Sequence, residues 1–363
     1  MDIIGIVAEY NPFHNGHLYQ INEIKKMYPN SIIIAIIDGY FGQRGNMSII
    51  TKEDKVSDAL SNGIDIVIEL PILFAIQSAD TFASKAIELL NELHINKLCF
   101  GSESNNLDIL NKIADKQLEH SFNNKVKEYL KEGINYPTAL KKALDIEFDY
   151  NNPNDLLAIS YIKAIKENNY DITPISIKRT NDYHDLSKND GIISANNIRN
   201  KIINKEDIKK FVPIVNDYHY NDYFKELKLS IINSNLNSIL DVDEGLDNNI
   251  LKAINKSNSL DELITNIKSK RYTYNKINRM LTHILLDIKK EDANLNNEYL
   301  KILGFNKAGK DYLNSIKKDI NLPLYSNKLI SKVKDYELKS SMIYDLINKT
   351  NTYDYEIKNK PIC

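Results

Sequence analysis

The sequence has little cysteine, no dominant charge and no long apolar run, and each shortage excludes a class of protein. Only two of the 363 residues are cysteines, Cys99 inside an apolar run and Cys363 at the end. This excludes a disulfide framework and a cysteine-based zinc site. Lys and Arg number 47 against 49 Asp and Glu, so nucleic acid could bind only through a local patch. The longest apolar region, residues 64–74, is broken by charges and a proline and falls short of the ~20 residues of a membrane helix.

The first residues also lack the pattern of a signal peptide. Residues 1–13 have neither the basic stretch nor the long apolar core of a signal peptide. The hydrophobic fraction of 42% and the charged fraction of 26% are those of an ordinary globular protein. We therefore expect a soluble cytoplasmic protein of two or three domains, with Cys99 as a small buried hydrophobe.

Short apolar runs alternate with amphipathic segments over the first two hundred residues. The continuous apolar runs predict buried strands at residues 3–8, 32–37, 64–68, 97–100 and 172–177. Helical periodicity predicts helices at residues 16–28, 52–62, 79–93 and 155–167. This order predicts an α/β fold with a parallel sheet covered on both faces, which binds ligands beyond the carboxyl ends of its strands.

The pattern changes after about Val212, where strand-like runs give way to helical patterns with Asn-rich connections. Helices are predicted at residues 222–234, 260–289 and 297–303. We expect a domain boundary near Pro213, which separates a nucleotide-binding domain of residues 1–212 from a mainly α-helical domain of residues 213–363.

A histidine pair follows the first predicted strand. His14 and His17 open the first helix three residues apart, so both imidazoles can face the same side. A helix N-terminus suits phosphate, and Gly16 lets a nucleotide approach the backbone closely. Two imidazoles there can donate hydrogen bonds as charge develops on phosphoryl oxygens. The pattern favours a nucleotide site over two packing histidines.

This H-x-G-H motif after a first strand resembles the nucleotidyltransferase superfamily of adenylyltransferases and class I aminoacyl-tRNA synthetases. The resemblance implies a Rossmann-like fold that holds ATP while a nucleophile attacks the α-phosphorus and pyrophosphate leaves. The stretch ISANNIR at residues 193–199 resembles the second signature of that superfamily, with Asn196 in place of the usual Thr. Ser194 can cap the following helix and can also contact a phosphate.

A closer resemblance rests on motifs spread over nearly the whole chain. They are GIVAEYNPFHNGH at 5–17, QRG at 43–45, ELP at 69–71, FGSE at 100–103, PN at 153–154, IKR at 177–179, YHD at 183–185, KSKRYT at 268–273 and LGF at 303–305. This series resembles the bacterial tRNA(Met) cytidine acetate ligases. That family activates acetate as acetyl-adenylate with ATP. It then acetylates the wobble cytidine of elongator tRNA(Met), which gives N4-acetylcytidine, AMP and diphosphate.

The resemblance implies the residues of the site. Catalytic roles fall on His14, His17 and Arg44. Arg44 sits in the Gly-flanked loop of residues 42–45, and a mobile loop with one guanidinium suits a clamp on pyrophosphate or the acetate carboxylate. The simpler interpretation of Arg44 is a solvated loop charge. ATP is the implied co-substrate, with Mg²⁺ expected beside it and no metal ligands assigned in the chain. The implied ATP-binding residues are Val7, Ala8, Glu9, Tyr10, Asn11, Pro12, Phe13, His14, Asn15, Gly16, His17, Leu18, Tyr19, Gln20, Gly101, Asn154, Arg179 and Ser194.

Simpler interpretations of several residues stay open. Gly101 could be a strand-ending turn, Asn154 only a helix cap, and Arg179 a surface charge. His184 could form an acid–base pair with Asp185 or only a loop hydrogen bond.

Three positions depart from the family pattern. Asp38 stands where a small residue is usual, Lys55 where Arg is common, and Asp155 where a second Asn is expected. Asp38 could alter the charge near the phosphates.

Residues 265–283 contain no acidic residue. The predicted helix of residues 260–289 places Lys268, Arg271, Asn275 and Arg279 on one face, because they are spaced 3, 4 and 4 residues apart. A basic stripe with tyrosines in a chain of net charge −2 indicates an RNA footprint. Together with the resemblance it predicts that Lys268, Lys270, Arg271 and Arg279 bind tRNA.

Two alternative functions remain. An adenylyltransferase that makes a small nucleotide cofactor would use the first domain but would not need the basic helical one. A non-catalytic tRNA-binding protein would not need the intact set of His14, Gly16 and His17. The sequence does not indicate an oligomeric state or an oligomeric partner.

Overall fold

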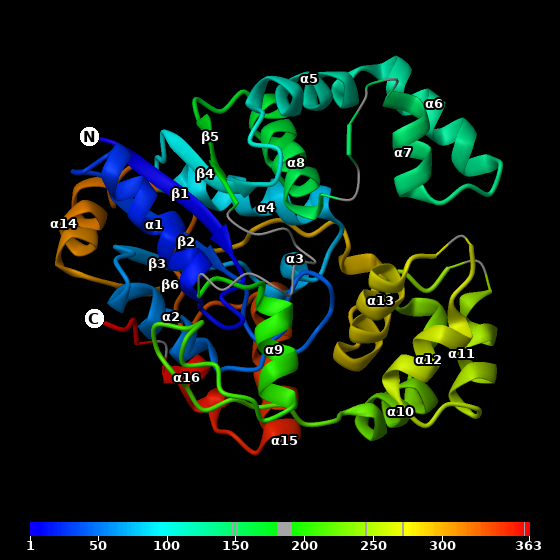
Figure 1. Ribbon diagram of the computed structural model, residues 1–363. Helices are drawn as coiled ribbons and strands as arrows, with labels where there is room; N and C mark the ends of the chain where they lie inside the picture. Colours follow the sequence, from blue (N-terminus) through cyan, green and yellow to red (C-terminus); the bar gives the residue numbers. More distant parts are fainter. Residues whose placement is uncertain are drawn as a thin grey trace.

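A six-stranded sheet forms the centre of the computed structural model, which describes residues 1–144, 146, 148–149, 152–179, 191–243, 245–270, 272–358 and 360–363. The strand order is β5-β4-β1-β2-β3-β6 (Figure 1). Five strands pair in parallel, and β6 (Ile302–Phe305) pairs antiparallel with β3 at one edge. The parallel strands are β1 (Ile3–Ala8), β2 (Ile32–Ile37), β3 (Ile66–Glu69), β4 (Lys97–Ser102) and β5 (Thr173–Lys178). The predicted α/β fold and its five strands are confirmed.

Helices cover both faces of the sheet. Ile4 and Ile6 of β1 pack on the face covered by α1 (Asn15–Met27) and α2 (Lys52–Ser61). Ile34 and Ile36 of β2 point to the opposite face. That face is covered by α3 (Ile72–Ala75), α4 (Ala79–Glu92) and α8 (Pro153–Glu167). Because side chains on both faces are buried, the central strands are continuous apolar runs instead of alternating ones.

Two segments extend from this core toward the same side of the molecule (Figure 1). The first is an arm between β4 and α8, which the sequence analysis did not predict as helical. It contains α5 (Leu107–Leu118), α6 (His120–Lys131) and α7 (Tyr136–Leu144). The second is a helical lobe of α10 (Phe224–Asn233), α11 (Leu246–Ile254), α12 (Leu260–Ile267) and α13 (Tyr274–Leu286), with the short 3₁₀ helices η1 (Leu236–Ser238) and η2 (Lys290–Asp292).

The end of the chain returns to the sheet. After β6 come α14 (Lys307–Ile316), α15 (Lys332–Asn348) and α16 (Thr352–Lys358), and α15 packs against α3. The second half is thus mainly helical, as expected, but it also supplies a strand. The domain boundary near Pro213 stays a prediction.

Two helix predictions are wrong. Residues 260–289 form two helices, α12 and α13, because α12 ends at Ile267 and α13 begins again at Tyr274. Residues 297–303 are not a helix, and Ile302 and Leu303 belong to β6. None of the helices in the described ranges is long and apolar enough to cross a membrane.

Candidate nucleotide site

A cavity of about 530 Å³ lies beyond the carboxyl ends of four strands, β1, β2, β4 and β5. Its position is the one expected for a ligand site in a parallel sheet. Most of the predicted residues line it, from segments far apart in the sequence. They are Val7, Ala8, Glu9, Tyr10, Asn11, His14, Gly16, His17, Tyr19, Gln20, Arg44, Gly101, Asn154, Arg179 and Ser194.

Four residues of the predicted ATP-binding stretch, Pro12, Phe13, Asn15 and Leu18, are not among the lining residues of this cavity. The buried ring of Phe13 packs on Tyr10 and His17, with centroids 4.8 and 5.4 Å away. The Asn15 amide donates to the carbonyls of Gly191 and Lys210, at 2.8 and 2.9 Å. Phe13 and Asn15 therefore shape and anchor the loop that presents the histidines.

His14 and His17 are held together by the start of α1. Nδ1 of His14 accepts from the backbone N–H of Gly16 at 3.0 Å, and Nδ1 of His17 accepts from the backbone N–H of His14 at 3.2 Å. This is a capping box in which imidazoles replace the usual side chains. The rings stack with centroids 3.8 Å apart. Local hydrogen bonds thus fix both rings before any ligand arrives.

Both imidazoles are neutral near pH 7. Burial, reinforced by Arg179 and Arg199, lowers the pKa of His14 to about 3. Burial and His14 lower the pKa of His17 well below its usual value. Because both Nδ1 atoms accept hydrogen bonds, each ring proton is on Nε2. The pair therefore offers two preoriented N–H donors, as transition-state stabilisation at a phosphoryl group requires.

The helix α9 (Ala195–Ile203) lies beside the histidine loop. Ser194 caps it by accepting from the backbone N–H of Asn197 at 3.3 Å. Arg199 donates from Nη1 to the carbonyl of Asn11 at 2.8 Å, so α9 is tied to the loop. Asn196, the departure from the superfamily signature, lines the cavity and accepts from Arg199 Nη2 at 3.5 Å.

Glu103 connects the residues that follow β4 and β5. Its carboxylate accepts from the Asn154 side-chain amide and, at 3.0 Å, from the backbone N–H of Asp155 at the start of α8. Nε of Arg179 lies 3.8 Å from the same carboxylate. A Cβ at Gly101 would come within 3.4 Å of the Arg179 side chain. Glu103 therefore orients both Asn154 and Arg179 toward the cavity.

The loop that carries Arg44 is fixed by α13, where the sequence suggested a mobile loop. Asn278 donates from Nδ2 to the Arg44 carbonyl at 2.8 Å, and Thr282 donates from Oγ1 to the Gly45 carbonyl at 2.7 Å. Gly45 has φ +82°, and a Cβ there would come within 2.9 Å of the Arg279 backbone. Only glycine suits this left-handed and crowded position.

The basic segment is divided by the break between α12 and α13. Lys268 caps the end of α12 and, like Lys270, is exposed, whereas Arg271 lies outside the described residues. Arg279 is on α13 and lines the cavity with Thr273 and Asn275. The expected single basic face is therefore wrong, because no continuous helix joins Lys268 to Arg279. That these residues bind tRNA stays a prediction.

Two of the departures from the family pattern are partners. Lys55 Nζ donates to Asp38 Oδ1 at 2.7 Å, and both side chains are buried. Burial raises the pKa of the Asp38 carboxyl to about 8, against the lowering effect of Lys55. Asp38 is not among the residues that line the cavity, so its contact is with Lys55 and not with a bound phosphate. His184 and Asp185 lie outside the described residues.

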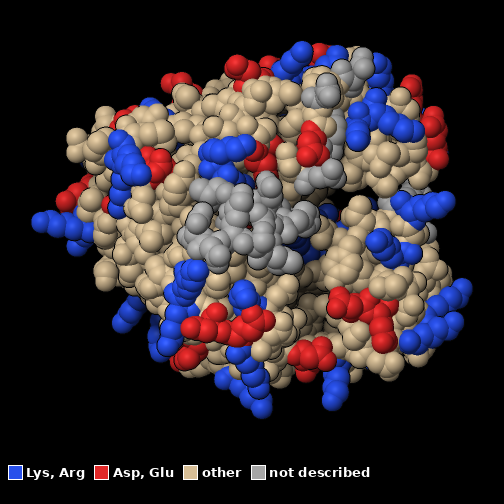
Figure 2. All heavy atoms as spheres, in the orientation of Figure 1, with Lys and Arg blue, Asp and Glu red and all other residues tan. Residues whose placement is uncertain are grey.

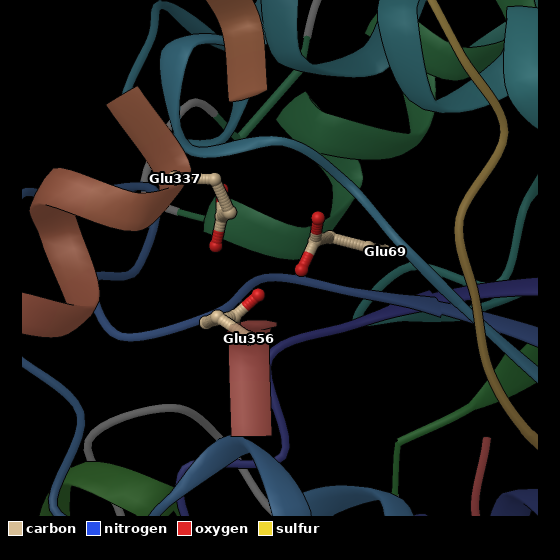
Figure 3. A group of neighbouring side chains, drawn as sticks. All are labelled: Glu69, Glu337 and Glu356. Atoms are coloured by element: carbon tan, nitrogen blue, oxygen red, sulfur yellow. The ribbon is translucent and has the colours of Figure 1, made fainter. Parts of the chain in front are cut away.

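Among the described residues, one group of carboxylates has the spacing of a metal site. Oxygens of Glu69, Glu337 and Glu356 lie within 4.8 Å of one another and point toward a common centre (Figure 3). Lys52 Nζ donates to all three carboxylates, and Lys301 donates to Glu69 and Glu356. Burial opposes the charge on Lys52, but the carboxylates outweigh it and hold its pKa well above the usual value. The ammonium groups stand where a metal would, and the cluster fastens α15 and α16 to the sheet.

The sequence analysis missed several residues that shape the site. The ISANNIR stretch pointed to Arg199 but gave no role to its contact with Asn11. Glu103 was seen only as part of a motif, although a carboxylate just after a strand is a reasonable partner for Arg179. Asn278 and Thr282 gave no signal, because their role depends on contacts with a loop more than 200 residues earlier.

The chain is similar to known proteins over its whole length. A family described as HIGH Nucleotidyl Transferase matches residues 1–360. A tRNA(Met) cytidine acetate ligase of Clostridium perfringens is 37% identical over 403 residues, covering 100% of this chain and 99% of the relative. The crystal structure of apo Thermotoga maritima TmcAL superposes with a TM-score of 0.90 at 25% identity, covering 100% of this chain and 99% of the other. The same protein bound with alpha-thio ATP superposes with a TM-score of 0.86, at the same identity and coverage.

Proposed function

The chain belongs to the HIGH nucleotidyl transferase family and, within it, to the tRNA(Met) cytidine acetate ligases, and we propose that it acetylates a tRNA cytidine at the expense of ATP. In the proposed reaction ATP and acetate give acetyl-adenylate and diphosphate. The acetyl group then passes to the exocyclic amine of the wobble cytidine of elongator tRNA(Met). The products are N4-acetylcytidine and AMP.

The observation that carries the proposal is the pair of neutral, preoriented imidazoles in a cavity at the end of a parallel sheet. A phosphoryl group placed beside His14 and His17 would accept both Nε2–H bonds without competition from bulk water. The structure of Thermotoga maritima TmcAL bound with alpha-thio ATP supports a nucleotide in this fold.

The first step needs no covalent bond to the protein. A carboxylate oxygen of acetate forms a bond to the α-phosphorus as the bond to the bridging oxygen breaks, and diphosphate leaves with the electron pair. His14 and His17 donate to the α-phosphoryl oxygens, whose charge grows in the transition state. Arg199 and the N-terminus of α9 lie beside the histidine loop, where they would bind the departing diphosphate.

In the second step the exocyclic amine of cytidine attacks the acetyl carbonyl, AMP leaves with the electron pair, and the amine proton passes to solvent. Cys99 takes no part, because the acyl group is carried by AMP. Burial raises the pKa of its thiol to about 12, which disfavours a thiolate nucleophile.

Mg²⁺ belongs to this proposal only as a companion of ATP. Glu9 is the one carboxylate among the described residues that line the cavity, so an octahedral site made by protein alone does not fit. Mg²⁺ fits as an ion bound to the phosphates, where it would neutralise charge. A cytoplasmic location stays a prediction.

The RNA would reach the cavity from the side where the arm and the helical lobe extend. Lys268 and Lys270 are exposed between α12 and α13, and the carbonyl of Lys270 accepts from Asn135 of the arm at 3.3 Å. On the face shown in Figure 2, Lys and Arg are interspersed with Asp and Glu. This distribution of charge favours RNA binding through a local patch over binding through a surface that is positively charged throughout.

The test is to incubate the purified protein with ATP, labelled acetate and elongator tRNA(Met), and to digest the tRNA for mass spectrometry. Labelled N4-acetylcytidine at the wobble position is the expected product, and omission of ATP should abolish it. A dinucleotide cofactor made without tRNA would support the adenylyltransferase. Binding of tRNA without any product would support the non-catalytic protein.

A further inference from the structure

Arg279 is a largely buried cation that forms no ion pair with any described carboxylate, and its side chain lines the nucleotide cavity. Its Nε is buried without a hydrogen-bond partner. Burial lowers the pKa of Arg279, opposed only by Asp241. The Asp241 carboxylate itself lies 3.4 Å from Nδ1 of His283. An unpaired buried charge is costly, so this position suits an anion supplied by a ligand.

The cations of the cavity divide into two groups. Arg179 and Arg199 act on His14, and both lower its pKa. Arg44 and Arg279 form the other group, because α13 holds the Arg44 loop at Gly45. Neither of these two guanidinium groups is among the charges that lower the pKa of His14 or His17.

The chemistry of the first step needs an anion site at each end. The attacking carboxylate and the departing diphosphate lie on opposite sides of the α-phosphorus in an in-line displacement. With the α-phosphate at the histidines, the β4–β5 side takes adenosine and α9 takes the diphosphate. The acid must then approach from the side away from α9, where Arg44 and Arg279 line the cavity. Resting on the proposed function, we infer that Arg279 binds the carboxylate of the acid substrate, with Arg44 beside it.

The geometry of α13 makes such a subsite rigid. The close contact of Gly45 with the Arg279 backbone sets the distance between the loop and the helix. The hydrogen bonds from Asn278 and Thr282 then fix the loop backbone on both sides of Gly45. A two-carbon acid offers few contacts, so its affinity must come from a fixed guanidinium fork on its carboxylate.

The test measures acetate-dependent ATP–pyrophosphate exchange without tRNA in the wild type and in three variants. Arg279→Gln should raise the KM for acetate about tenfold or more, the usual cost of losing a charge-assisted hydrogen bond. Arg279→Lys, which keeps the charge but loses the fork, should fall between it and the wild type. Lys276→Gln is the matched control on α13. Its ammonium lies 5.2 Å from the centroid of the Tyr272 ring, and it does not line the cavity.

Two binding measurements identify the anion. The affinities for a non-reactive ATP analogue and for tRNA should stay within about twofold of the wild type in Arg279→Gln. A loss of affinity for the ATP analogue would mean that Arg279 binds the triphosphate. A loss of tRNA affinity alone would mean that Arg279 binds RNA. Either result overturns the inference, as does an unchanged KM for acetate.

Folding and function are separable in this test. The ligand-free melting temperature of Arg279→Gln should be unchanged or slightly higher, because the substitution removes an unpaired buried charge. If Arg279→Gln is unstable, the KM for acetate of Arg279→Lys tests the inference instead: a raised KM supports it, and an unchanged KM overturns it. Absence of acetate-dependent exchange in the wild type would instead overturn the proposed function.

Discussion

The two sides of the cavity are built in different ways. On one side, the histidine loop between β1 and α1 is a single segment whose hydrogen bonds join residues two or three positions apart. On the other, α13 reaches a loop more than 230 positions away through Asn278 and Thr282. The local side is visible in sequence as a motif. The distant side exists only in the folded chain, so the groups that act on phosphate can be read directly from the sequence, whereas the pairing of the Arg44 loop with Arg279 cannot.

The largest expected effect comes from breaking the histidine side alone. His17→Gln keeps an acceptor for the backbone N–H of His14, as a capping box requires, but removes the imidazole donor. Acetyl-adenylate formation without tRNA should fall by about 10²–10³. Rapid-quench measurement of adenylate tests this, with thermal melting as the control for folding. A near-normal rate in a folded variant would remove the histidines from the chemistry.

A second comparison separates the RNA step from both sides of the cavity. Lys268 and Lys270 are exposed and do not line the cavity. The double variant Lys268→Gln/Lys270→Gln should weaken tRNA binding and reduce its salt slope, by about 1 for each lost phosphate contact. Exchange without tRNA should be unchanged, and titrations at several salt concentrations give both numbers. An unaltered salt slope would place the RNA surface elsewhere.

A smaller effect is expected from weakening the contact between α13 and the Arg44 loop. Thr282→Val removes the hydrogen bond to the Gly45 carbonyl, a loss of about 1 kcal/mol for a neutral bond. If this bond positions the Arg44 loop, the KM for acetate should rise about fivefold, while the affinity for a non-reactive ATP analogue should not change. Equal loss of both affinities would mean that Thr282 acts only through general stability.

The last effect concerns stability instead of catalysis, and it appears as the pH falls. The pKa of His14 is about 3 in the folded protein against an ordinary value of 6.5, so below pH 6.5 the unfolded chain binds the proton and the folded one does not. The stability from neutral His14 is present above pH 6.5 and is lost as the pH falls toward 3. His14→Asn, which keeps an N-cap acceptor, should lack this loss. Between pH 6.5 and 5 the wild type should lose about 2 kcal/mol more than the variant in urea unfolding.

If the two unfolding curves run parallel over that range, His14 is not buried as a neutral group in solution. The comparison uses the difference between the two proteins at each pH, because other buried carboxyls such as Asp58, with a pKa raised to about 6 by burial, titrate in both.

Much of the sheet could be predicted because buried parallel strands are continuous apolar runs. The predicted limits of the first two strands are those of β1 and β2, and the other three lie within two residues of the observed ends. The sixth strand, Ile302–Phe305, was missed because a four-residue strand at the edge of the sheet is too short to show a clear apolar pattern. It was instead taken as the end of a helix.

The error at α13 shows why the distant side was missed. The stretch from Ile267 to Tyr274 contains no Gly or Pro, so nothing in its composition marked a helix break. Thr273 caps α13 by accepting from the backbone N–H of Lys276 at 3.3 Å. A single threonine is too common in the sequence to indicate a helix start by itself. With one continuous helix assumed, Arg279 was grouped with Lys268 instead of with Arg44. The cluster of Lys52, Lys301 and three glutamates was missed because its members come from five separate segments.

The most direct test of the account is a crystal structure with a non-hydrolysable acetyl-adenylate analogue, in which a sulfamoyl group replaces the α-phosphate. We expect the adenosine beside Gly101 and Asn154, and the sulfamoyl oxygens within hydrogen-bond distance of the two imidazoles. The acetyl group should point toward Arg44 and Arg279 on the α13 side. An acetyl group that points toward α9, or a ligand bound away from His14 and His17, would contradict the account.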